Sequence, residues 1–128
     1  MKLLLDTHAL LWWLAGDSVR LSRRARAAIG DDENSVHVSA ATAWEIATKL
    51  RLGKLDADAL ADGIGQILAA QTFVALDISI DHAERAGTLP GEHKDPFDRM
   101  LIAQAQAENM TLVSNEGLFD SYGVKRLW

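Results

Sequence analysis

Short apolar runs alternate with longer segments of helical periodicity, and this alternation constrains the fold more than any other feature of the chain. Leu3 to Leu5 and Leu112-Val113 are typical of buried strands, whereas the segments between the apolar runs repeat apolar residues at helical spacing. We expect strands at residues 2–5, 36–38, 73–76, 112–114 and 124–127, and helices at about 7–15, 22–29, 39–52, 59–70, 80–89 and 96–109. Such alternation predicts an α/β fold of three layers, with helices on both faces of a parallel sheet of four to five strands.

The size and composition of the chain limit its class. Its 128 residues are enough for one domain, residues 1–128, and 48% hydrophobic with 24% charged residues is typical of a globular protein. No apolar run approaches the ~18 residues that a membrane helix needs, so we expect no membrane partner. The absence of cysteine excludes disulfides and thiolate zinc sites and fits a reducing cytosol, so we predict a cytoplasmic protein. The net charge of -5 argues against nucleic-acid binding through overall positive charge, although it is compatible with a local basic rim.

Four acidic residues stand where such a fold brings distant segments together. Asp6 ends the first apolar run and Glu116 follows the fourth strand, while we expect Glu45 and Asp98 in the first turns of two helices. In open parallel sheets the functional crevice lies beyond the carboxyl ends of the strands. The four acids are therefore expected to converge at that edge.

Each acid also has an ordinary structural explanation. Asp6 can cap the helix that follows it, and Glu45 can pair with Lys49 four residues later. Asp95, followed by Pro96, is typical of a helix start. Asp98 shares its helix face with the apolar side of the same helix, which should point it toward the sheet. The joint arrangement of the acids, rather than any single one, indicates a site.

Clustered carboxylates favour a divalent cation. Acids with apolar neighbours are costly to bury unless something neutralises them. Oxygen-only ligands suit Mg²⁺, with Mn²⁺ as an alternative. Such ions lower the pKa of a bound water and orient it for attack. The residues therefore predict a metal-dependent hydrolase that acts on phosphodiesters.

Several blocks of the sequence resemble the motifs of PIN domains, and in particular of VapC-type toxins. These blocks are residues 4–14, 39–49 with 52–55, 95–105, 112–116 and 122–128, which together span nearly the whole chain. The resemblance implies a PIN fold and a Mg²⁺-dependent endoribonuclease that forms the toxin half of a toxin–antitoxin pair. It also implies a homodimer and a small VapB-like antitoxin that inserts near the active site and silences it.

The resemblance also assigns roles to residues. It implies catalytic roles for the acidic core of Asp6, Glu45 and Asp98 with the adjoining Asp95, and it implies that these four and Glu116 bind the metal. Glu116 departs from the family pattern, in which Asp is usual, and its longer arm places the second ion in question. Further candidates, for contact with RNA, are Ser114, Arg99, His93 and Lys49; Ser114 could instead position a water or Asp6, and the basic residues could simply be solvated.

Other functions remain open at this level. A phosphatase with an Asp nucleophile should carry a second acid two residues after Asp6, where this chain has His8. A receiver module should carry paired acids after the first strand, and glycine-rich phosphate loops are absent. A catalytically weak PIN-like scaffold that only binds protein or RNA remains an alternative. The apolar stretch 10–14 is interpreted as a partner surface, with a doubly covered core helix as the alternative.

Overall fold

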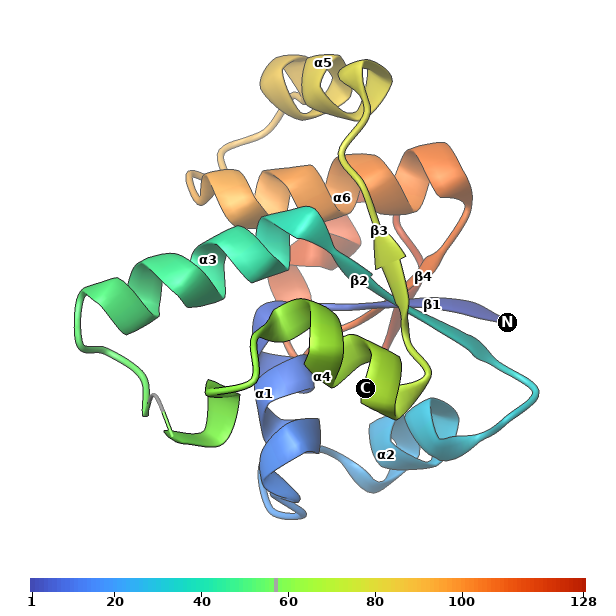
Figure 1. Ribbon diagram of the computed structural model, residues 1–128. Helices are drawn as coiled ribbons and strands as arrows, with labels where there is room; N and C mark the ends of the chain where they lie inside the picture. The colour runs from blue at the N-terminus through green and yellow to red at the C-terminus, as the bar shows by residue number, and fades with distance from the viewer. Residues whose placement is uncertain (57) are drawn as a thin grey trace.

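Parallel strands form a single sheet at the centre of the molecule (Figure 1), in a computed structural model that describes residues 1–56 and 58–128. The strands of the described residues are β1 (Lys2–Leu5), β2 (Ser35–Ser39), β3 (Val74–Leu76), β4 (Thr111–Val113) and β5 (Arg126–Leu127). Their order across the sheet is β3-β2-β1-β4-β5, and every pairing is parallel. The first strand is thus central, which places the residue after it in the middle of the carboxyl edge.

Helices cover both faces of this sheet, as the alternation predicts. They are α1 (Thr7–Ala15), α2 (Arg23–Gly30), α3 (Ala40–Arg51), α4 (Ile64–Gln71), α5 (Ile80–Thr88) and α6 (Pro96–Glu108), with 3₁₀ turns η1 (Asp58–Leu60) and η2 (Gly117–Tyr122). Successive side chains of β1 point to opposite faces. Leu3 and Leu5 join the core under α1 and α2, whereas Leu4 joins the core under α6. The three-layer α/β prediction is confirmed.

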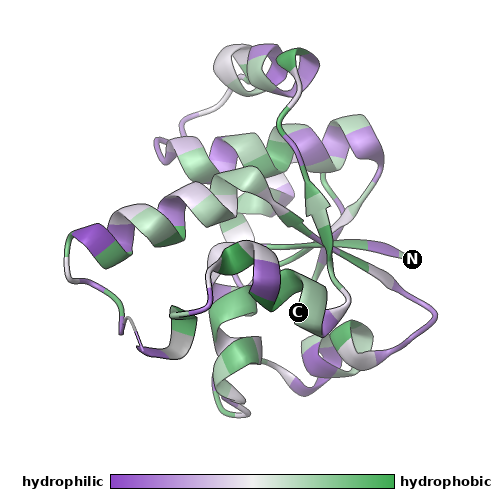
Figure 2. Cartoon of the chain, in the orientation of Figure 1, coloured by the Kyte–Doolittle hydropathy of each residue, from purple (hydrophilic) through white to green (hydrophobic). Residues whose placement is uncertain are grey.

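The helix starts follow the capping residues of the sequence. Ser22 and Ser39 accept hydrogen bonds from the backbone amides of Ala25 and Ala41, at the starts of α2 and α3. Figure 2 shows hydrophobic segments in the central strands and mixed polarity in the outer helix α5. Burial of apolar side chains therefore fixes the sheet, and local caps fix where α2 and α3 begin.

One predicted helix is wrong. A single helix over residues 59–70 was expected, but the chain makes the short turn η1 and then starts α4 at Ile64. Gly63 separates them with φ of 83°, a left-handed conformation that disfavours any residue with a Cβ. The last predicted strand, residues 124–127, is also shorter, because only Arg126–Leu127 is assigned to β5.

The apolar stretch of α1 is largely covered by the domain itself. Leu10 is fully buried, and residues 11–14 are partly buried against the core below the sheet. The Trp13 indole also donates a hydrogen bond of 2.9 Å to Gln71 of α4. This coverage leaves less free area for a partner than the sequence suggested. None of the helices in the described ranges is long and apolar enough to cross a membrane.

Candidate active site at the carboxyl edge of the sheet

Asp6 lies at the centre of the site, immediately after β1. Its side chain is 6% exposed, and its Oδ1 accepts a hydrogen bond of 2.8 Å from the amide of Ala9, so it caps α1. Burial raises the pKa of Asp6 and the negative charge of Glu45 raises it further, whereas the Ser114 hydroxyl, which hydrogen bonds to it, opposes the shift. Asp6 therefore both caps α1 and contributes its carboxylate to the acidic site.

Asp98 enters the same site from the first turn of α6. Asp95 caps this helix by accepting hydrogen bonds from the amides of Phe97 and Asp98, at 2.9 and 3.3 Å. Burial raises the pKa of Asp98 to about 6, and the negative charges of Asp95 and Asp6 add to this shift. His93 opposes it, since its Nε2 lies 2.9 Å from Asp98 Oδ2. The Asp98 carboxyl is thus held among like charges with one adjacent imidazole.

Glu45 reaches the site from α3, although from its second turn and not from the first turn as expected. Its side chain is 13% exposed. The Thr7 hydroxyl donates a hydrogen bond of 2.6 Å to Oε1, and Lys49 Nζ lies 3.0 Å from Oε2. The ordinary pairing with Lys49 therefore exists, but it occurs within the acidic cluster and partly balances its charge.

The loop between α5 and α6 is fixed in place, and this fixes His93. The guanidinium of Arg99 donates to the backbone carbonyls of His93, at 3.0 Å, and of Leu89. The His93 amide donates to the Tyr122 hydroxyl at 3.0 Å. Tyr122 also passes so close to Gly91 that a Cβ there would lie 2.5 Å from its hydroxyl. Both guanidinium contacts are to backbone, so Arg99 holds this loop in place; its predicted contact with substrate stays a prediction.

Replacing Arg99 by Ala should loosen the loop. The free energy of unfolding is expected to fall by about 1–3 kcal/mol, because two carbonyls lose their charged donor. RNA cleavage should fall as well, since His93 loses its fixed position beside Asp98. Chemical denaturation measures the first effect, with Arg24→Ala on the exposed side of α2 as the control. Equal stability of the two variants would contradict this assignment.

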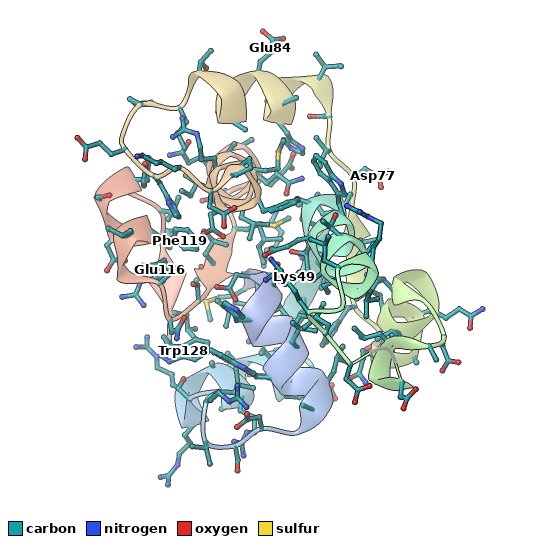
Figure 3. All side chains as sticks on the ribbon, turned by 90° about the vertical axis from the view of Figure 1, so that its left-hand side faces the viewer. Lys49, Asp77, Glu84, Glu116, Phe119 and Trp128 are labelled. Carbon is teal, nitrogen blue, oxygen red and sulfur yellow. The ribbon has the colours of Figure 1, made fainter. Side chains whose placement is uncertain are left out.

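Ser114 and Glu116 follow β4, as predicted, and both are held by hydrogen bonds. Ser114 is fully buried, accepts a hydrogen bond of 3.0 Å from the Glu116 amide and hydrogen bonds to Asp6. It is therefore a positioning residue and cannot contact RNA directly. Glu116 caps η2 through the Leu118 amide at 3.1 Å. Figure 3 looks onto the carboxyl edge and shows Glu116 on the side of Phe119, with Lys49 nearer the middle.

The donor set fits a hard cation in chemistry and charge. Asp6, Glu45, Asp95 and Asp98 offer only oxygen, and burial raises the pKa values of Asp6 and Asp98, with smaller contributions from neighbouring carboxylates. In this structure Lys49 neighbours the Glu45 carboxylate, and the His93 imidazole neighbours that of Asp98. Within residues 1–56 and 58–128, no group of three or more acidic or histidine side chains stands at ligand distance. A bound cation would therefore require these carboxylates to turn toward one another.

Two contributors were missed in the sequence. Thr7 orients Glu45, and Tyr122 pins the loop that carries His93. The position of Thr7 directly after Asp6 is a usable signal, because it places the hydroxyl at the same edge of the sheet. Tyr122 gives no such signal, since its contact with His93 crosses 29 residues of sequence.

A parallel sheet with helices on both faces and a group of acids at its carboxyl edge defines a class of three-layer α/β protein. The chain belongs to the PIN domain family, whose model matches residues 3–125. No curated protein sequence matches it.

Several solved structures have the same fold as this chain. VapBC2 from Rickettsia felis, solved with a DNA fragment from its promoter, aligns with a TM-score of 0.75 and 18% identity over 100% of this chain and 99% of that one. VapC20 from Mycobacterium tuberculosis, described as a sarcin–ricin loop cleaving toxin, gives 0.70 and 16% over 95% of both chains. FitAcB from Neisseria gonorrhoeae gives 0.68 and 19% over 98% and 96%. At these identities the likeness establishes the fold.

Proposed function

We propose that this protein is a Mg²⁺-dependent endoribonuclease and the toxin of a toxin–antitoxin pair. The observation that carries the proposal is the convergence of Asp6, Glu45, Asp95 and Asp98 at one sheet edge, three of them from different elements. Several fold neighbours are VapBC complexes, and one is a toxin that cleaves the sarcin–ricin loop.

In this proposal Asp6 and Asp98 hold the cation, while Glu45 and Asp95 orient water or ligand. Mn²⁺ could replace Mg²⁺, and Glu116 supports a second ion. When bound, such a cation lowers the pKa of water and offsets charge on the phosphate. Ser114 and Thr7 keep the carboxylates of Asp6 and Glu45 in place. His93 holds Asp98 from the other side.

The proposal extends to partners and location. A VapB-like antitoxin would bind near the crevice and block RNA, and two copies of this chain would form a homodimer. The fold neighbours crystallised as VapBC and FitAB complexes support the antitoxin. We place the protein in the cytoplasm, where its RNA substrates are found.

Incubation with single-stranded RNA in Mg²⁺ and in EDTA tests the activity. We expect cleavage inside the strand with Mg²⁺, none with EDTA, and restoration by Mn²⁺. The protein should not hydrolyse para-nitrophenyl phosphate, which a phosphatase would turn over. Undiminished cleavage in EDTA would contradict the proposal, and RNA binding without any cleavage would favour the scaffold alternative.

A further inference from the structure

An exposed tryptophan stands next to the acidic cluster. Trp44 directly precedes Glu45 on α3, yet 66% of it is exposed to solvent. The ring of Phe97, which directly precedes Asp98 on α6, packs edge-on against it, with centroids 5.1 Å apart and planes at 79°. Phe97 therefore holds the indole in one orientation and leaves much of its surface free. Both aromatic residues are sequence neighbours of proposed catalytic acids.

The tryptophan borders a hollow of about the size of a small ligand. This cavity has a volume of about 280 Å³ and lies between α3, α5 and α6. Its walls are largely apolar and include Ala41, Ile78, Pro96 and Met100. Small-molecule sites usually start at roughly 300 Å³ and have mainly apolar walls. The hollow is thus suited to a flat apolar group with polar edges that reach solvent.

A second hollow continues from the first and carries basic residues. Its volume is about 500 Å³, it shares Pro96 and Phe97 with the first, and it includes Glu45 and Asp95 of the acidic cluster. Three lysines line it, namely Lys49, Lys54 and Lys94. Lys49 is engaged with Glu45, whereas Lys54 and Lys94 lie on the exposed surface. Positive charge beside an apolar hollow matches an anionic chain that carries flat bases.

We propose that the apolar hollow is a nucleobase subsite, in which one unpaired base of the substrate stacks on Trp44 while the flanking phosphates lie along Lys54 and Lys94. The proposal rests on the proposed nuclease function and specifies its substrate as single-stranded. Bases in a duplex are already stacked and cannot enter the hollow. The hollow that carries the lysines also includes Glu45 and Asp95, so RNA held in this way would lie beside the acidic cluster.

A protein segment is the competing occupant of this apolar face. Leu52, directly after α3, is also half exposed, and an apolar helix could pack against it and Trp44. The lysines and the continuity with the acidic cluster favour nucleic acid instead. The two occupants also differ in what they require at position 44, because a protein helix needs apolar bulk whereas a base needs an aromatic face.

Binding of a fluorescently labelled RNA hexamer to the Asp6→Asn protein in Mg²⁺ tests the subsite without cleavage. In this background we expect Trp44→Leu to weaken binding about 5-fold to 100-fold, the range for loss of one stacked base, and Trp44→Phe to restore most of it. Lys54→Ala with Lys94→Ala should weaken binding and lower its salt dependence. The same hexamer in a perfect duplex should bind at least about 10-fold more weakly.

The controls separate the possible failures. Val19→Ala, an exposed apolar position on the far segment after α1, should leave binding unchanged. Full binding by Trp44→Leu, or a change of oligomeric mass in that variant with unchanged RNA affinity, would overturn the subsite in favour of a protein interface. If the wild type cleaves RNA and Trp44→Leu has an unchanged KM, only the subsite fails. If the wild type cleaves no RNA, the proposed function fails regardless of Trp44.

Discussion

The Asp6→Asn protein is expected to lose RNA cleavage by at least about 100-fold and to remain folded. Asp6 is 6% exposed directly after the central strand, and its carboxylate interacts with that of Glu45. Removal of that charge takes away a proposed ligand, and loss even of residues that support metal ligands typically costs 10–100-fold. Asparagine keeps a side-chain oxygen that can cap α1 as Asp6 Oδ1 does for the Ala9 amide. Initial rates of RNA cleavage in saturating Mg²⁺ measure the effect.

A matched control separates the loss of a charge from the loss of this particular charge. Asp62→Asn removes the same carboxylate from an exposed turn before α4, and we expect it to leave cleavage within about twofold of wild type. Circular dichroism should give the same spectrum for all three proteins. Cleavage by Asp6→Asn at the wild-type rate would show that the reaction occurs elsewhere.

The Asp98→Asn protein is expected to be more stable than wild type in the absence of metal. The pKa of Asp98 is raised from 3.8 to about 6 in the folded protein, mainly by burial, so ionisation opposes folding. As the pH rises, the carboxyl ionises earlier in the unfolded chain than in the folded protein. The contribution of Asp98 to stability is therefore present at pH values below its ordinary pKa of 3.8 and is lost as the pH rises through about 6. At pH 7.5 the free energy of unfolding of the variant should exceed that of wild type by about 1–3 kcal/mol. Thermal unfolding in EDTA at pH 4 and pH 7.5 measures this difference.

Three comparisons test that electrostatic explanation. The gain should be much smaller near pH 4, because Asp98 is then protonated in the folded protein and, with an ordinary pKa of 3.8, partly protonated in the unfolded chain. Asp81→Asn, whose side chain is 65% exposed and paired with Arg85, should show no such gain. Mg²⁺ should stabilise the wild type at pH 7.5 and have little effect on Asp98→Asn, because a cation that binds only the folded state raises its stability. A variant less stable than wild type at pH 7.5 would contradict the charge crowding described here.

The elements that depend on local chemistry were predictable from the sequence. The apolar run before Asp6 predicts the central strand, and Ser22, Ser39 and Asp95 mark helix starts that the structure contains. Parallel order then follows from alternation, and with it the edge at which Asp6 must lie. The fold was therefore predictable from the sequence, because these strands and helix starts are set by residues close together in the chain.

The features that depend on distant segments were not predictable. The helix expected over residues 59–70 is interrupted because Gly63 adopts a positive φ, which the sequence allows but does not require. The bond from Thr7 to Glu45 spans 38 residues and fixes which way the carboxylate faces. Arg99 looked like a basic rim residue, yet its partners are carbonyls of a loop that closes onto it. Composition cannot distinguish a cation that faces solvent from one that is held by backbone.

Isothermal titration calorimetry of the metal-free protein with Mn²⁺ and Mg²⁺ at pH 7.5 tests most directly whether the acidic residues form one cation site. We predict saturable heat for wild type and for Asp62→Asn. Binding should weaken as the pH falls below about 6, because the Asp98 carboxylate becomes protonated. We predict no saturable heat for Asp6→Asn or Asp98→Asn. Equal binding by all four proteins, or no binding by wild type, would contradict the claim that these carboxylates form one cation site.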